Sequence, residues 1–192
     1  MSVEKTKIAD PGPLGLNCFA LTTFLLSCVN AGLIDMEAAG HVWLTSGLVF
    51  GGIVQILAGM WEFKTGNLFG ATAFSSYGSF WLSLSLITVF ANIGYIPDSE
   101  INTTLTGWFL IAWTIFTFYM WIGSFKINTA LNVTFTLLLI TFILLDIGHF
   151  GYPIFNIAGG YVGILTALAA WYTSAAGLLN IIFGETVVPT QR

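Results

Sequence analysis

The run HVWLTSGLVFGGIVQILAGMW, from His41 to Trp61, decides the fold, because it holds no Lys, Arg, Asp or Glu. A helix that crosses a bilayer needs about 20 largely apolar residues, and this run is long enough. The whole chain of 192 residues is 56% hydrophobic and only 7% charged, whereas soluble domains carry about 25% charged residues. The sequence therefore predicts an integral membrane protein that lies mostly within the lipid bilayer.

Five further apolar runs accompany this one, and charged residues, glycines or prolines separate them. The six predicted spans are Leu14–Ile34, His41–Trp61, Leu68–Ile93, Thr104–Ser124, Ile127–Asp146 and Asn156–Phe183. We predict an all-α integral membrane fold of six transmembrane helices. It forms one domain over residues 1–192 and begins with a short tail at residues 1–9.

The distribution of charge predicts the orientation of this bundle. With six spans, every basic residue falls on one side, namely Lys5, Lys7, Lys64, Lys126 and Arg192. The connections on the opposite side carry only acidic residues, which are Asp35, Glu37, Asp98 and Glu100. The positive-inside rule then predicts that both termini are cytoplasmic.

The spans also exclude several classes of protein. None of them contains a Lys or Arg, so they offer neither a lysine for a retinal Schiff base nor a buried cation to neutralise a substrate. The motifs GxSxG, HExxH, CxxC and the P-loop are absent from the sequence. We therefore expect no enzyme activity, no cofactor, no metal site and no nucleic-acid partner.

The polar residues inside the spans are hydroxyls and amides. Thr22 shares a helix face with Phe19, and Gln55 continues a ladder of glycines at four-residue spacing. Such small residues commonly serve close helix contact, which is the simpler interpretation. A buried Gln needs partners, however, so Gln55 favours a polar pathway. Phe19, Tyr77 and Leu138 lie on or beside these faces and can meet as a constriction that gates by dewetting.

Three ionisable residues near the span ends are candidates for a gate or for proton transfer. Glu62 and Lys64 are two positions apart, which predicts a solvated turn pair, with a gate as the alternative. Asp146 and His149 are spaced i and i+3, so they can form a proton relay. The simpler interpretation is that both reach the outer interface.

Two blocks of the sequence resemble a known family. The segment DPGPLGL at Asp10–Leu16 is similar to the NPAPLGL signature of the acetate uptake transporter family, which includes succinate–acetate permeases. Its leading Asn is Asp10 here and its Ala is Gly12. The block FGGIVQILAGMWEFKTGNLFGATAFSSYGSFWLSL at Phe50–Leu84 and the terminal GYVGILTALAAWY at Gly160–Tyr172 resemble further blocks of that family.

The resemblance implies a homohexamer of six-helix protomers in the plasma membrane, with one pathway per protomer for acetate and in some members succinate. Passage is channel-like or coupled to protons. The family's hydrophobic constriction corresponds to Phe19, Tyr77 and Leu138. The residues implied in substrate passage or selectivity are Asp10, Leu14, Gly15, Leu16, Thr22, Gln55 and Ala170. Because the spans hold no cation and the outer loops are acidic, we expect the protonated acid, or an anion together with a proton, to pass.

Two other functions are compatible with the sequence alone. An uncharged pathway also suits a facilitator of a small neutral solute such as ammonia or glycerol. Glycine-rich helix faces also suit a membrane sensor or scaffold that transports nothing. Asp10 has two interpretations as well, since it can cap the first helix or titrate with a passing proton.

Overall fold

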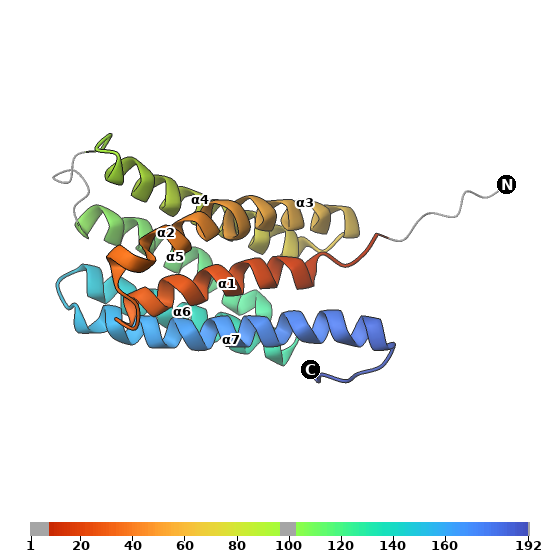
Figure 1. Cartoon of the computed structure of the whole chain (residues 1–192). Coiled ribbons are helices and arrows are strands. Elements are labelled where there is room, and N and C mark those ends of the chain that lie inside the picture. The colour runs from red at the N-terminus through yellow and green to blue at the C-terminus, as the bar shows by residue number, and fades with distance from the viewer. Residues whose placement is uncertain (1–7, 97–102, 192) are drawn as a thin grey trace.

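The structure is a computed structural model, which describes residues 8–96 and 103–191, without the side chains of residues 36–41 and 103–105. In these ranges all regular secondary structure is helical, as predicted, and the helices run side by side along the length of the molecule (Figure 1). The elements in chain order are α1 (Gly12–Asn30), α2 (Met36–Leu48), η1 (Val49–Val54), α3 (Gln55–Thr65), α4 (Leu68–Asn92), α5 (Thr103–Ser124), α6 (Thr129–His149) and α7 (Ile154–Phe183).

Six helical segments are long and apolar enough to cross a membrane, which confirms the predicted spans. The second span combines α2, η1 and α3 and continues to Thr65, four residues beyond the predicted end. It stops there because Gly66 adopts a left-handed conformation with φ of 82° and ends the helix. The first helix begins at Gly12, since Pro13 fits the first turn of a helix, where no partner is needed for its missing N–H.

The middle of the second span is a π-helix, η1, between the α-helical segments α2 and α3. A π-turn contains more residues than an α-turn, so it rotates the residues that follow, and such turns are frequent at functional sites. The residues at four-residue spacing, which are expected to share one face, therefore contact different helices. Gly47 lies against Ser85 of α4, Gly51 against Thr22 of α1, and Gln55 lines a cavity.

Small residues on α7 also allow the helices to approach closely. A Cβ atom at Gly160 would lie 2.3 Å from the backbone nitrogen of Ala31, so no larger residue fits between α7 and α1. Gly163 lies one turn further along α7, against the hydroxyl of Ser27. These contacts hold the C-terminal end of α1 against α7.

Both ends of the described chain lie at the same end of the bundle (Figure 1). The last turn of α3, which contains Lys64, and the connection that contains Lys126 lie at this terminal end, and the connection that contains Asp35 lies at the far end. The other charged residues that set the predicted orientation lie outside the described residues or their described side chains: Lys5, Lys7, Glu37, Asp98, Glu100 and Arg192. Cytoplasmic termini thus stay a prediction.

Candidate functional site

Two cavities enter the bundle from its opposite ends. The proximal cavity opens near the termini and has a volume of about 430 Å³. The distal cavity, of about 210 Å³, reaches toward the far end, where Asn30 and His149 line it. Three residues line both cavities, and they are Phe19, Tyr77 and Leu138. These side chains therefore form the partition between the two cavities.

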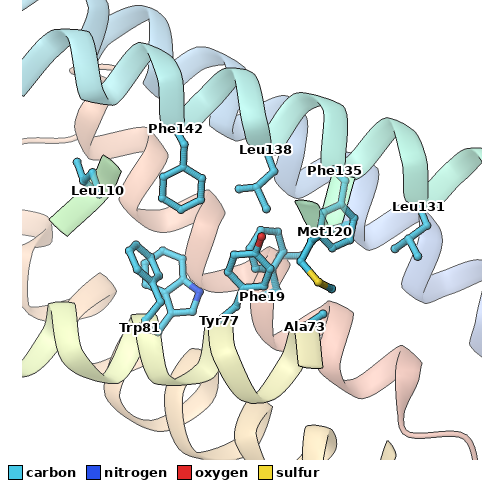
Figure 2. Packing of buried hydrophobic residues seen from close by; sticks show 13 residues of the cluster. Phe19, Ala73, Tyr77, Trp81, Leu110, Met120, Leu131, Phe135, Leu138 and Phe142 are labelled. Carbon is cyan, nitrogen blue, oxygen red and sulfur yellow. The ribbon is translucent and has the colours of Figure 1, made fainter. Parts of the chain in front are cut away.

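The partition is a layer of apolar side chains from three helices. Phe19 of α1, Tyr77 of α4 and Leu138 of α6 are buried and belong to one hydrophobic cluster. Figure 2 shows them in the middle of this cluster, with Leu138 reaching from α6 toward the rings of Phe19 and Tyr77. The two ring centroids are 5.7 Å apart. An apolar layer of this kind resists the passage of water and ions, because neither finds hydrogen bonds within it.

A hydrogen bond to α5 holds the Tyr77 ring in this layer. The Tyr77 hydroxyl and Thr117 Oγ1 are 2.8 Å apart, and both groups are buried. The Tyr77 hydroxyl is therefore hydrogen-bonded to α5, and the apolar ring of Tyr77 forms part of the partition. Phe116 packs edge-on against the same ring, with centroids 5.1 Å apart.

Ala170 lies in the same layer, on α7. Two pairs of hydroxyls join α6 and α7 on either side of it. Thr141 and Thr166 Oγ1 atoms are 3.1 Å apart, and those of Thr134 and Thr173 are 3.5 Å apart. The shared helical spacing of these pairs places Ala170 opposite Leu138, where it is fully buried in the same cluster. Ala170 lines neither cavity, and its small side chain leaves room for the residues of the partition.

Gln55 is a fully buried amide on the proximal side of the partition. It is 0% exposed, it lines the proximal cavity, and neither Oε1 nor Nε2 has a hydrogen-bond partner in the described part of the chain. A buried amide without partners is costly, and natural proteins keep such groups mainly where a ligand or water binds. Gln55 therefore offers one donor and one acceptor to a molecule in the cavity.

The DPGPLGL segment borders the mouth of the proximal cavity. Asp10 and Leu16 line it, together with Gly12 and Pro13 between them. The Asp10 carboxylate accepts a hydrogen bond of 2.8 Å from the N–H of Gly12, the first residue of α1. Asp10 therefore satisfies one of the free N–H groups at the helix start, although Pro11 occupies the N-cap position itself.

Leu14 and Gly15 correct the expectation that the whole segment faces the pathway. Leu14 is 45% exposed on the outside of the bundle, and Gly15 packs against the ring of Phe74. Neither lines a cavity. Leu14 lies on the other side of α1 from Gly12, Leu16 and Phe19, whereas Gly15 shares their face but packs against Phe74, which itself lines the proximal cavity.

Thr22 is a second correction, since it lines neither cavity. Its hydroxyl donates to the carbonyl oxygen of Cys18 at 3.0 Å and faces Gly51 of η1. A Cβ atom at Gly51 would lie 2.4 Å from Thr22 Oγ1, so the two helices touch at this point. Thr22 therefore serves helix packing in this structure.

Glu62 also differs from its expectation, because it is not a solvated partner of Lys64. Its side chain is 1% exposed and lines the proximal cavity, whereas Lys64 is exposed. Glu62 Oε2 accepts a hydrogen bond of 3.1 Å from Thr65 Oγ1, and Oε1 has no partner among the described residues. The last turn of α3 thus carries a buried carboxyl at the proximal cavity.

Asp146 and His149 lie close together but make separate hydrogen bonds. Asp146 Oδ2 accepts from Thr114 Oγ1 at 2.7 Å, which joins α6 to α5. His149 Nδ1 is 2.8 Å from the carbonyl oxygen of Leu145. Only His149 lines the distal cavity, so the structure assigns Asp146 to the contact between α5 and α6.

Three asparagines at the proximal cavity were not predicted from the sequence. Asn67 and Asn128 line it and also cap α4 and α6, accepting bonds from Gly70 and Leu131 N–H. An Asn before an apolar run is a recognisable N-cap signal. Asn180 lines the cavity from α7 and holds the C-terminal segment, because its side chain bonds to the backbone of Val187 and Val188.

The C-terminal segment also covers the start of α6. The N–H groups of Thr129 and Ala130 donate to the carbonyl oxygens of Gln191 and Thr190, at 3.0 and 3.2 Å. The free N–H groups at a helix start otherwise favour anions. In this structure the first two of α6 are already satisfied.

Comparison with known proteins identifies the family. The sequence model of the GPR1/FUN34/yaaH family matches residues 1–189. The chain belongs to this family. It is 40% identical to the succinate-acetate/proton symporter SatP of Escherichia coli strain K12, over 96% of each chain. It is 38% identical to acetate permease A of Emericella nidulans, over all of this chain and 68% of that protein.

A solved structure in this family has the same fold. The structure of the bacterial acetate channel SatP superposes with a TM-score of 0.90 at 38% identity, covering 96% of this chain and 99% of that one. Family membership and six apolar helices together make this chain a multi-pass membrane protein.

Proposed function

We propose that this chain carries acetate and related short carboxylates, including succinate, across the plasma membrane, and that it has no enzyme activity. The observation that carries the proposal is the pair of cavities divided only by Phe19, Tyr77 and Leu138. Two water-accessible cavities that meet at a thin apolar layer form a pathway with one barrier. The similarity to proteins named for acetate and succinate supports this substrate class.

The residues along this pathway suit a weakly held or neutral carboxyl group. Gln55 supplies an amide donor and acceptor beside the partition, which match a carboxyl group. No Lys or Arg is among the residues that line either cavity in the described part of the chain. A bare carboxylate therefore has no cation to replace its hydration as it crosses, so the protonated acid meets the lower barrier.

A neutral solute such as ammonia or glycerol fits the same cavities, but the relatives reported above favour carboxylates. The test is uptake of labelled acetate and succinate by purified protein in liposomes at neutral pH. Protein-free vesicles set the passive background. This background is large for acetate, because the neutral acid crosses lipid, so succinate gives the sharper signal. Uptake of neither acid above the background would refute the proposal, and faster uptake of methylammonium or glycerol would favour the alternative.

We extend the proposal to assembly as a homohexamer. The fold resemblance to the family supports it, and so do Ser79 and Ser83, which are exposed on the outer face of α4. Small hydroxyl residues on membrane helices are typical of contacts between helices rather than with lipid. Light scattering of the purified protein should give six times the 20.8 kDa protomer mass after correction for detergent. A monomeric mass would refute the assembly.

We also propose that the proximal cavity opens to the cytoplasm. Lys64 and Lys126 lie at the same end as this cavity, in agreement with the positive-inside rule. A single cysteine in place of Lys126, after replacement of the buried Cys18 and Cys28, should react with an impermeant maleimide only in inside-out vesicles. Labelling of right-side-out cells would reverse the orientation.

A further inference from the structure

Glu62 is the one buried carboxyl among the described residues that line the two cavities. It is 1% exposed, and Oε1 has no hydrogen-bond partner in the described ranges. Lys64 and Lys126 are the lysines whose side chains the structure describes. Both are exposed, and neither forms an ion pair with Glu62. An ionised carboxylate in this position would lack the partners that buried charges normally have.

The hydrogen bonds around Glu62 suit a protonated carboxyl. Thr65 Oγ1 lies 2.9 Å from the Glu62 carbonyl oxygen and 3.1 Å from Glu62 Oε2. A hydroxyl has one proton, so it satisfies two such acceptors only in part. A proton on Oε2 would complete the arrangement, because the carboxyl would then donate to Thr65 while Thr65 donates to the carbonyl oxygen.

Among the residues that the structure describes, the elements packed against Glu62 contribute one further charged group, Asp10. This residue belongs to the segment that leads into α1, and Gly12 separates the two carboxyls. A Cβ atom at Gly12 would lie 3.0 Å from Asp10 Oδ1 and 3.5 Å from Glu62 Oε1. From α4 only neutral groups approach, at Asn67 and Gly70, where a Cβ atom would lie 2.7 Å from Glu62 Oε1. Neutral groups and one acidic side chain therefore surround the Glu62 carboxyl in the described part of the chain, and none of them is a cation.

We propose that Glu62 exchanges a proton with the substrate carboxylate on the proximal side of the partition; this inference rests on the proposed carboxylate transport. When the substrate moves from the proximal to the distal cavity, the O–H bond of Glu62 breaks and an O–H bond forms on the substrate carboxylate. The neutral acid crosses the layer of Phe19, Tyr77 and Leu138. The Glu62 carboxylate then takes a proton from a hydronium ion at the open end of the proximal cavity, which leaves a water molecule. In the opposite direction the same steps run in reverse, and one proton accompanies each carboxyl group that is neutralised.

The position of Glu62 fits this step. It lies seven residues after Gln55 on the same helix, which is two turns or about 10 Å. Both side chains line the proximal cavity. A short carboxylate can therefore receive its proton at Glu62 and meet the Gln55 amide just before the partition. Glu62 is the proton donor, and Gln55 positions the acid.

The test compares wild type with Glu62→Gln and Glu62→Asp in liposomes that contain a pH-sensitive dye. An inward succinate gradient drives transport, and tracer uptake and proton entry are measured together, with the membrane potential clamped. Glu62→Gln keeps the shape but cannot release a proton, so uptake at pH 7.5 should fall about 100-fold, the low end of what a positioned proton donor contributes. Glu62→Asp should restore much of the uptake.

The pH profile separates proton transfer from a structural role. Near pH 4, about half of ordinary carboxyl groups carry a proton in solution, so much of the succinate needs no proton from Glu62. The difference between wild type and Glu62→Gln should therefore shrink toward none. Equal uptake and proton entry in both proteins at pH 7.5 would overturn the inference, as would a deficit in Glu62→Gln that is the same at every pH and is not rescued by Glu62→Asp. Absence of succinate and acetate uptake in wild type would instead overturn the proposed function.

Discussion

The hydrogen bond between Tyr77 and Thr117 should fix the ring that closes the pathway. Its atoms are 2.8 Å apart, Thr117 is fully buried, and Tyr77 is nearly so. Tyr77→Phe keeps the ring but leaves the Thr117 hydroxyl buried without its partner. Thr117→Val does the converse. Each single change should cost about 1–3 kcal/mol, the penalty of a buried polar group left unpaired.

The double variant Tyr77→Phe with Thr117→Val removes both polar groups and keeps both shapes. Its loss should be smaller than the sum of the two single losses, since replacing both partners by apolar groups is close to neutral. The coupling in this double-mutant cycle should be about 1–2 kcal/mol, within the range found for residues in direct contact. For a chain of this length, each kcal/mol lowers Tm by about 2–4 °C.

The assay is thermal unfolding of the purified protein in detergent, followed by succinate uptake in liposomes. Both single variants should unfold at lower temperature, and both should transport faster, because the ring is no longer held in the partition. The double variant should recover most of the stability. Two single variants with unchanged Tm and unchanged uptake, or strictly additive losses, would refute the idea that this bond positions the ring.

Three further changes test other parts of the site. Gln55→Leu removes the free amide at similar volume, so carboxylate uptake should fall while Tm holds or rises, measured on one preparation; unchanged uptake would remove Gln55 from the pathway. Gly51→Ala should lower stability by about 1–3 kcal/mol through overpacking, because the new Cβ would lie 2.4 Å from Thr22 Oγ1, and Thr22→Ala should relieve part of the loss; no relief would mean that Thr22 is not the obstacle. Ala170→Phe should block succinate more than acetate by filling the layer opposite Leu138, and an unaltered ratio of the two uptakes would contradict that placement.

The sequence was sufficient to predict the fold, because six runs of apolar residues leave few other arrangements for such a chain. It was also sufficient to bring Phe19, Tyr77 and Leu138 together, although Leu138 lies 61 positions beyond Tyr77. The three residues sit on faces that helical spacing and the family resemblance both single out. Their contact in one layer agrees with that expectation.

Other features depended on contacts that spacing alone does not reveal. The π-helix before Gln55 has no sequence signature and changes the direction of the residues after it. Thr22 follows the same periodicity as Phe19 but faces a glycine of another helix. Glu62 is close to Lys64 in sequence, but its helix continues past it and turns the carboxyl inward. In each case the neighbouring helix decides the role, and a single sequence does not show which helix that is.

The central claim is that carboxylates pass through the layer formed by Phe19, Tyr77 and Leu138. The most direct test is succinate uptake by wild type, Phe19→Ala and Phe19→Trp, reconstituted at equal density and corrected with protein-free vesicles. Removing the Phe19 ring joins the two cavities and enlarging it thickens the partition, so uptake should increase in Phe19→Ala and decrease in Phe19→Trp. The same uptake in all three correctly folded proteins would contradict a pathway through this layer.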